Sequence, residues 1–154
     1  MTNRERIQKF VDGLRFGGYR QYYGGLGRRE PGTGDRFCAL GVACEVARAN
    51  GLDVGVDYSA FGGFVSYYDP ADPTLKTAEV LPRLVADWYG VAELGMPVGV
   101  THDEVLALNP GIVFGPGYDG RATDLVSLND GVRLTFAQIA DLVERTYLKE
   151  DDPV

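Results

Sequence analysis

The feature that most constrains this fold is an almost wholly apolar run that begins shortly after Asp35. The run covers residues 37–47 and carries both cysteines of the chain, Cys38 and Cys44. With Asp35 as a cap, it predicts a helix over about 36–50. A helix that is apolar on nearly every side must be covered from several directions. We therefore expect the rest of the chain to pack around this central helix.

The length and composition predict a single globular domain over residues 1–149, followed by a frayed acidic tail at 150–154. The chain has 154 residues, of which 45% are hydrophobic and 24% are charged, which is enough to build one core. No apolar run approaches the roughly 20 residues that span a bilayer, and the first residues lack the apolar segment of a signal peptide. We therefore expect a cytoplasmic protein with no membrane association.

The two cysteines lie six residues apart on the predicted helix, too far around and along it to form a disulfide with each other. We interpret both as free thiols that fill the core. A structural zinc site needs about four His or Cys ligands, whereas this chain offers Cys38, Cys44 and His102. Neither common glycine-rich nucleotide loop occurs. The sequence therefore predicts no metal and no cofactor.

Capping signals predict further helices near both ends of the chain. A Ser or Thr followed three residues later by Glu or Gln is typical of a helix start. This pattern occurs in Thr2 with Glu5, Thr101 with Glu104, and Thr135 with Gln138. Another helix is indicated by apolar residues at helical spacing over 81–88, with Gly90 as its terminator. The segment 123–128 could add one more turn.

Strand signals are shorter and lie mostly in the middle of the chain. Residues 54–58 and 64–68 are rich in aromatic and β-branched side chains, with Gly62 and Gly63 between them, which predicts a hairpin. Further short strands are indicated at 112–114 and 19–23. Together these patterns predict an α+β fold: a helix-dominated single domain with a small antiparallel element.

The charges are unevenly distributed along the chain, which has a formal net charge of -7. Residues 1–36 hold eight basic and four acidic residues, whereas the remainder holds seven basic and eighteen acidic residues. One interpretation is that the basic segment lies against an acidic body and the charges partly neutralise. The alternative is a basic strip that binds a ligand or a partner. The strip would comprise Arg20, Tyr22, Tyr23, Arg28, Arg29 and Arg36. The overall acidity disfavours a nucleic acid as the ligand.

Four motifs, in this order, resemble a group of small uncharacterised proteins encoded by actinobacteriophages and their actinobacterial hosts. They are residues 36–45, the segment from Leu81-Pro82 to Val91, residues 128–131, and residues 135–141. The chain departs from the group's pattern at Ala39, where a second cysteine is common, and in a longer segment over 95–119. The resemblance implies a phage or prophage setting and an accessory role such as host takeover or counter-defence.

One set of residues raises the alternative of a cysteine-dependent hydrolase. Cys38, His102 and Asn129 occur in the chain order of a papain-like catalytic set, and Cys38 lies near a predicted helix N-terminus. Against this hypothesis, an apolar helix favours the neutral thiol. Asn129 and Asp130 could instead present two side-chain acceptors to a ligand, but Asn129-Asp130-Gly131 is more typical of a turn whose side chains satisfy local backbone groups.

The sequence therefore predicts a non-enzymatic accessory protein that binds a host protein through the basic strip or an acidic face. Two alternatives stay open. In the first, a pocket lined by Arg20, Tyr22, Arg28 and Arg36 sequesters a small phosphate-bearing or nucleotide signal. In the second, Cys38 serves a hydrolase. The oligomeric state is left open.

Overall fold

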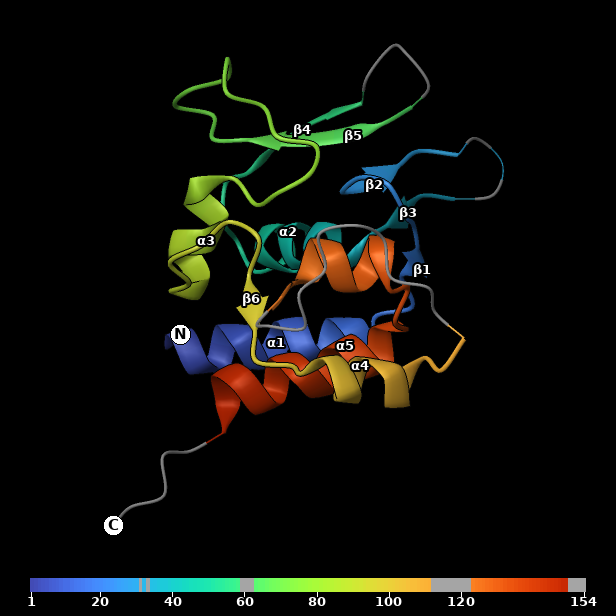
Figure 1. The fold of residues 1–154 in the computed structure, drawn as a ribbon. Helices are drawn as coiled ribbons and strands as arrows, with labels where there is room; N and C mark the ends of the chain where they lie inside the picture. The colour runs from blue at the N-terminus through green and yellow to red at the C-terminus, as the bar shows by residue number, and fades with distance from the viewer. Residues whose placement is uncertain (31, 33, 59–62, 112–122, 150–154) are drawn as a thin grey trace.

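The computed structural model describes residues 1–30, 32, 34–58, 63–111 and 123–149. The fold is α+β and helix-dominated, as the sequence predicts, with short strands in three small sheets at different places around the helices (Figure 1). A hydrophobic cluster of buried residues extends along the chain from Ile7 to Leu148. The predicted acidic tail and the strand predicted at 112–114 lie outside the described residues.

The helices begin where the capping signals predict. All three capping boxes form: Thr2 starts α1 (Asn3–Phe16), Thr101 starts α4 (His102–Leu108), and Thr135 starts α5 (Phe136–Val143). In each, the threonine side chain accepts a backbone N–H while the Glu or Gln side chain accepts the N–H of the threonine. The helix α3 (Arg83–Tyr89) ends at Gly90, which adopts the left-handed conformation at φ 76°.

The C-terminal part of the chain departs from regular α-helix. The predicted turn over 123–128 becomes a short strand followed by a π-helix, η1 (Ser127–Gly131). A second π-helix, η2 (Glu144–Leu148), continues α5. Short sequence patterns predict a helix but do not distinguish this wider winding, which is rare and occurs mostly as single turns.

The central helix is shorter than predicted. It is α2 (Ala39–Ala49), with Cys38 rather than Asp35 as its N-cap. The prediction of a helix from 36 was wrong because residues 36 and 37 form a strand, and the Cys38 N–H donates to Leu26 O at 3.0 Å. As predicted, the helix is buried nearly all round: Ala39, Leu40, Gly41, Val42, Ala43, Cys44, Val46 and Ala47 are buried.

Three small sheets complete the fold. In the first, β3 (Arg36–Phe37) lies between β1 (Arg20–Gln21) and β2 (Gly27–Arg28), parallel to β1 and antiparallel to β2. The predicted hairpin forms as β4 (Gly55–Tyr58) and β5 (Val65–Tyr68). The third sheet pairs β6 (Pro97–Val98) with β7 (Thr123–Asp124). The predicted small antiparallel element is thus present in the pairings of β2 with β3, β4 with β5 and β6 with β7, and the parallel pairing of β1 with β3 adds to it.

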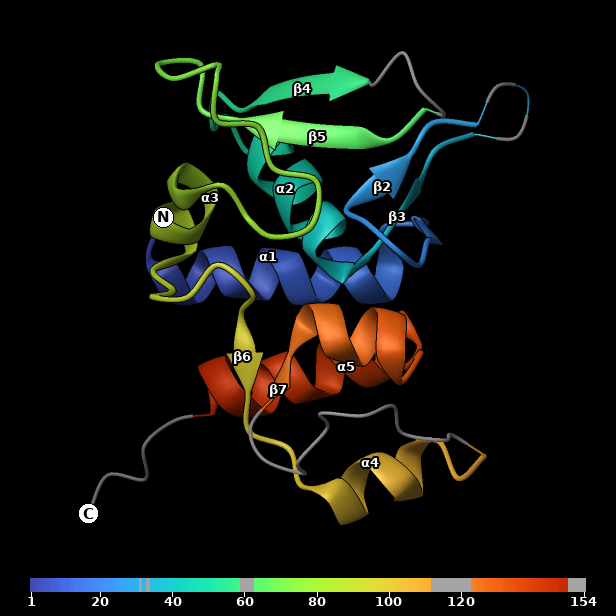
Figure 2. The same ribbon diagram turned by 45° about the horizontal axis from the view of Figure 1, so that its top comes forward.

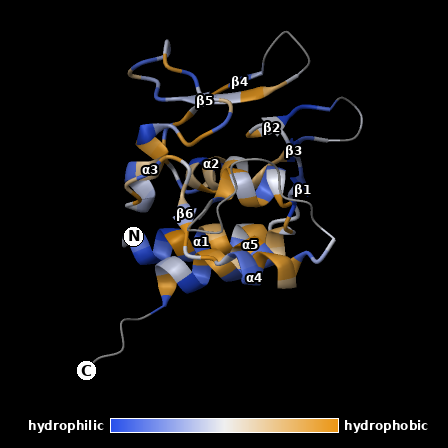
Figure 3. Ribbon diagram, in the orientation of Figure 1, coloured by the Kyte–Doolittle hydropathy of each residue, from blue (hydrophilic) through white to orange (hydrophobic). Residues whose placement is uncertain are grey.

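The helices form a layered stack beside these sheets. Figure 2 shows α1 between α2 on one side and α5 on the other, with α4 on the far side of α5. Hydrophobic residues predominate in α2 and α5, whereas α1 carries both hydrophobic and hydrophilic residues and buries Ile7, Phe10, Val11 and Leu14 (Figure 3). No helix among the described segments is both long and apolar enough to cross a membrane.

Candidate functional site

Three arginines lie side by side on one face of the first sheet. Arg36, in the middle strand, is directly opposite Arg20 in β1 and Arg28 in β2. Cross-strand partners project their side chains to the same face, and sequence neighbours project to the opposite face. The neighbour Phe37 is buried, and its Cβ lies beside Gly41 of α2. The arginines therefore face away from the core, and we call Arg20, Arg36 and Arg28 the arginine row.

Gly27 lets the strands of this sheet approach closely. A Cβ at this position would lie 2.9 Å from the backbone oxygen of Arg36 and 2.9 Å from the ring of Phe37. A side chain there would therefore push β2 away from β3. The glycine next to Arg28 helps to hold the row in register.

The arginine row continues into the hairpin at an exposed aromatic side chain. Arg28 forms an isolated antiparallel bridge with Phe64, and the neighbouring Arg29 N–H donates to Gly63 O at 2.8 Å. Phe64 is 42% exposed, and its ring centroid lies 5.7 Å from the guanidinium carbon of Arg28. The first sheet and the hairpin are thus joined, and the row ends at the exposed ring of Phe64.

A glutamate lies among these arginines. The Glu30 carboxylate accepts a hydrogen bond from Arg36 Nη2, and its other oxygen lies 4.0 Å from Arg20 Nη2. Arg36 also lies over the ring of Tyr22, with 5.4 Å between guanidinium carbon and ring centroid. Its Nε is buried and has no hydrogen-bond partner within the described part of the chain. The row with Glu30 keeps a net charge of +2 in a chain of net charge -7.

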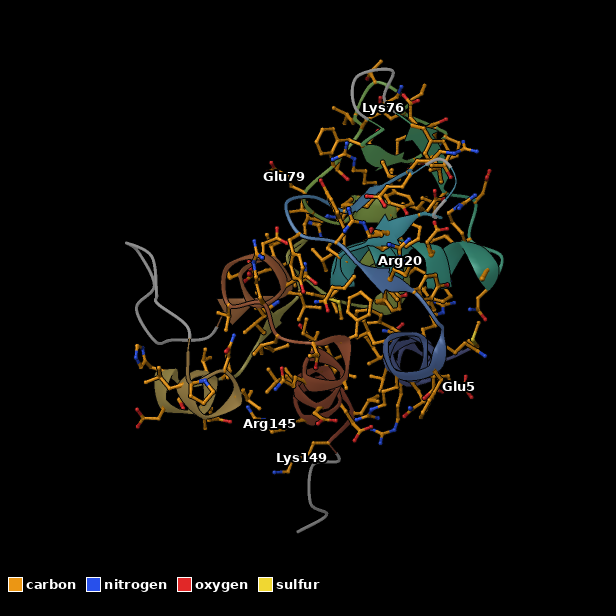
Figure 4. All side chains as sticks on the ribbon, turned by 90° about the vertical axis from the view of Figure 1, so that its right-hand side faces the viewer. Glu5, Arg20, Lys76, Glu79, Arg145 and Lys149 are labelled. Atoms are coloured by element: carbon orange, nitrogen blue, oxygen red, sulfur yellow. The ribbon has the colours of Figure 1, made fainter. Side chains whose placement is uncertain are left out.

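Figure 4 looks onto this side of the molecule. Arg20 lies toward the viewer, above the end of α1, whereas Arg145 and Lys149 lie apart from it beside the C-terminal helical segment. The side chain of Arg20 is 49% exposed and that of Arg36 is 32% exposed, so both are within reach of a ligand in solution.

The structure divides the strip that the sequence predicts. Arg20, Tyr22, Arg28 and Arg36 come together, since Tyr22 contacts Arg36. Two predicted residues lie elsewhere. Arg29 lies over the ring of Tyr58 at 4.6 Å, and Tyr23 lies under Arg133 at 4.6 Å.

Tyr58 is the strand partner of the buried Val65, so Arg29 is on the other side of the sheet from Arg28. Successive side chains of a strand point to opposite faces, so the sequence alone already contained the signal that Arg28 and Arg29 lie on different faces. Glu30 and Phe64 were missed as site residues. No local pattern indicates Phe64, because it reaches Arg28 only through the packing of the hairpin against β2.

The thiol predicted as an alternative nucleophile is deeply buried. Cys38 is 3% exposed, and its Sγ accepts a hydrogen bond from the Gly41 N–H at 3.4 Å. Burial raises the pKa of the Cys38 thiol to about 12, an effect that the hydrogen bond from Gly41 only partly opposes. Burial also raises the pKa of Cys44. Both cysteines are free, and at neutral pH the native protein holds them as neutral thiols.

His102 does not approach this thiol. It is the first residue of α4, which lies on the far side of α5 and α1 from α2 in Figure 2. Asn129 does approach, because its Oδ1 accepts the N–H of Ala39, the residue after Cys38, at 3.2 Å. The structure thus brings two of the three predicted catalytic residues together, without the base that would activate a thiol.

Asn129 is the one fully buried polar residue within the described ranges. Its Oδ1 also accepts from Gln21 Nε2 at 2.9 Å, while its Nδ2 donates to Tyr22 O at 2.8 Å and to Asp130 Oδ1 at 2.8 Å. Both acceptor positions and both donors of the amide are in use. The partners at Gln21, Tyr22 and Ala39 are distant in sequence, which corrects the expectation that Asn129 satisfies local groups in a turn.

Two open grooves lie away from the arginine row. One, of about 430 Å³, lies between α1 and the C-terminal helical segment and is lined by charged residues that include Arg4, Glu144 and Lys149. The other, of about 350 Å³, lies between α4 and α5 and is lined in part by Leu108 and Leu142. Within the segments that the structure describes, no group of three or more His, Cys, Asp or Glu could hold a metal ion.

The comparisons with known proteins assign a family without an activity. No curated protein matches this sequence, and no solved structure matches it. A family model described as a domain of unknown function, DUF8296, matches residues 2–147, which include every described helix except the last residue of η2. The chain therefore belongs to the DUF8296 family.

Proposed function

We propose that this protein is a non-enzymatic binding protein that engages a partner protein through the arginine row, Tyr22 and Phe64. The observation that carries the proposal is the register of Arg20, Arg36 and Arg28 on one solvent-facing side of a sheet. Arginine and aromatic side chains are enriched where protein interfaces hold most of their binding energy. The row and its neighbours combine both kinds of side chain on adjacent strands of one sheet.

The charge distribution favours a partner that binds the arginine row through a compact acidic surface. The row is locally positive, whereas the chain as a whole has a net charge of -7. A short acidic segment can contact the row alone, while a long polyanion extends beyond it and meets the acidic remainder of the surface. This contrast supports a protein partner over a nucleic acid.

The setting is part of the proposal. The motifs that resemble actinobacteriophage and actinobacterial proteins support a phage or prophage accessory protein, acting in the bacterial cytoplasm on a host protein. Host takeover and counter-defence are the roles that such an interaction would serve. A binding role requires neither a nucleophile nor a cofactor, which agrees with the neutral state of the buried Cys38 thiol.

The test is a capture experiment with a matched control. Tagged wild-type protein, an Arg20→Glu/Arg28→Glu variant and an Arg29→Glu/Arg133→Glu variant are incubated with actinobacterial lysate. Both variants change the charge equally, but Arg29 and Arg133 lie outside the row. We expect a host protein that the wild type and the control retain and the row variant loses. Equal retention by both variants, or no retained protein at all, would contradict the proposal.

A second candidate function is the binding of a small phosphate-bearing molecule. It is favoured by the common location of Arg20, Tyr22, Arg28 and Arg36, since guanidinium groups and an aromatic ring suit phosphate and base, respectively. Thermal unfolding in the presence of nucleoside diphosphates and triphosphates tests it. A ligand at one hundred times its Kd stabilises the fold by about 2.7 kcal/mol. An unchanged melting temperature across the series would rule this candidate out.

A further inference from the structure

We infer that the Glu30 carboxylate occupies, within this chain, the position that a carboxylate of the partner takes on the arginine row. The inference rests on the proposed function and specifies its chemistry: the recognised element is an acidic protein segment, and it binds by displacing Glu30 from Arg36 and Arg20.

The first observation is that the Glu30 carboxylate contacts arginines of two neighbouring strands, β3 and β1. One carboxylate oxygen is bonded to Arg36 and the other lies 4.0 Å from Arg20. A carboxylate presents two acceptor oxygens that suit guanidinium donors. The row therefore already holds one carboxylate in the manner that recognition of an acidic side chain requires.

The second observation is that this carboxylate leaves the row incompletely neutralised. Arg28 has no ion pair among the described residues, and its recorded side-chain contact is with the exposed ring of Phe64. The buried Nε of Arg36 has no hydrogen-bond partner in the described part of the chain. Adjacent strands are about 4.8 Å apart, so the row extends roughly 10 Å across the sheet. A segment with two or more acidic side chains can reach both Arg28 and the Glu30 position.

The third observation concerns how firmly Glu30 is held. Its side chain is 24% exposed and that of Arg20 is 49% exposed. The half-exposed pair with Arg20 contributes little to folding stability. An acidic side chain of the partner that takes the place of Glu30 on Arg36 replaces one charge-assisted hydrogen bond with another of the same kind. Glu30 thus lowers the apparent affinity for an acidic ligand by the fraction of time that it occupies the row.

The test measures the binding of a fluorescein-labelled peptide of ten glutamates by anisotropy at low salt, with full-length protein. The variants are Glu30→Gln and Glu93→Gln, which change the net charge equally. Glu93 lies in the segment between α3 and β6, on the other side of the molecule from β1 and β3 (Figure 1). We expect Glu30→Gln to bind about fivefold more tightly than Glu93→Gln. A Glu30→Asp variant retains the charge and should bind no more tightly than the wild type.

The outcomes separate this inference from the proposed function. Equal affinities for Glu30→Gln and Glu93→Gln would overturn the role of Glu30, while loss of binding in Arg20→Glu/Arg28→Glu would still support the row. Unchanged binding in that row variant would instead overturn the proposed function. No binding of the glutamate peptide by any variant, or tighter binding of a decathymidylate than of this peptide, would overturn the assignment of a carboxylate ligand. Urea unfolding of each variant verifies that its fold is retained.

Discussion

The buried amide of Asn129 with its hydrogen-bond partners, which we call the Asn129 junction, and the arginine row are both assembled from polar groups that are distant in sequence. They differ in how many of these groups find a partner within the protein. Asn129 is fully buried, and its amide forms four hydrogen bonds within the protein. In the row, Arg36 is bonded to the Glu30 carboxylate, Arg20 lies 4.0 Å from it, and Arg28 has no ion pair among the described residues. Buried polar groups must find partners inside the protein, whereas exposed charges can use water or another molecule. The junction is therefore a structural element, and the row is the surface available for binding.

The largest expected effect comes from removing the amide of Asn129. An Asn129→Ala substitution leaves the buried Ala39 N–H without this acceptor and Tyr22 O without this donor, and it removes one of the two acceptors of Gln21 Nε2. We expect a loss of about 3 kcal/mol in the free energy of unfolding. The control is Asn109→Ala, which removes one recorded hydrogen bond, to Val132 O, and should cost about 1 kcal/mol. Urea unfolding measures both losses. A loss for Asn129→Ala that is equal to or smaller than that for Asn109→Ala would contradict the structural role of the Asn129 junction.

An intermediate effect is expected on the pH dependence of the free energy of unfolding, from the buried Cys38 thiol next to this junction. The pKa of Cys38 is raised from 9.0 in the reference state to about 12 by burial. Above pH 9 the unfolded chain releases this proton and the native protein retains it, so stability falls as the pH rises. Between pH 7 and pH 10 this one group should cost about 1 kcal/mol.

A Cys38→Ser variant sharpens this test, because serine can also cap a helix but does not titrate in this range. Its stability, measured by urea unfolding at each pH, should fall less steeply between pH 8 and pH 10 than that of the wild type. The buried Cys44, Tyr67 and Tyr89 contribute to the alkaline loss in both proteins, because burial raises the pKa of each of them. Identical slopes for the two proteins would show that the native Cys38 thiol titrates like an exposed one.

The smallest effect on stability is expected from the row itself. Arg20→Ala combined with Arg28→Ala removes a half-exposed, distant ion pair and an exposed contact with Phe64. We expect the free energy of unfolding to change by no more than about 0.5 kcal/mol, because exposed charge contacts contribute little. Thermal unfolding of the double variant measures this. A loss as large as that of Asn129→Ala would mean that the row is a structural element as well.

The sequence predicts the helices better than the sheets, for a physical reason. A capping box is a local interaction between a threonine and the residue three positions later, so Thr2, Thr101 and Thr135 indicate their helices directly. The strand β3 has only two residues and follows no local pattern. It exists because it pairs with β1 and β2, and a local pattern contains no information on that pairing. The helix of the apolar run was therefore predicted to start at 36, whereas it starts at Ala39.

The candidate site was predicted in part. The density of arginine and tyrosine over residues 20–36 indicates a basic strip, and four of its six predicted residues do share one face. Arg29 and Tyr23 do not belong to the site, because their side chains lie on other sides of the chain and contact Tyr58 and Arg133. Glu30 and Phe64 belong to it because of how a loop and the hairpin pack against the first sheet.

By itself, the sequence determined where most helices start, that the helix of the apolar run is buried, and that the basic residues are concentrated before residue 37. These properties follow from hydrogen bonds and hydrophobic spacing within a few residues. Only the tertiary structure decided that Arg36 lies between Arg20 and Arg28, that Glu30 occupies the row, and that Asn129 joins the α2 N-terminus to the segment after β1. Each of these contacts joins residues whose distance in space is set by the packing of whole elements, which no local pattern records.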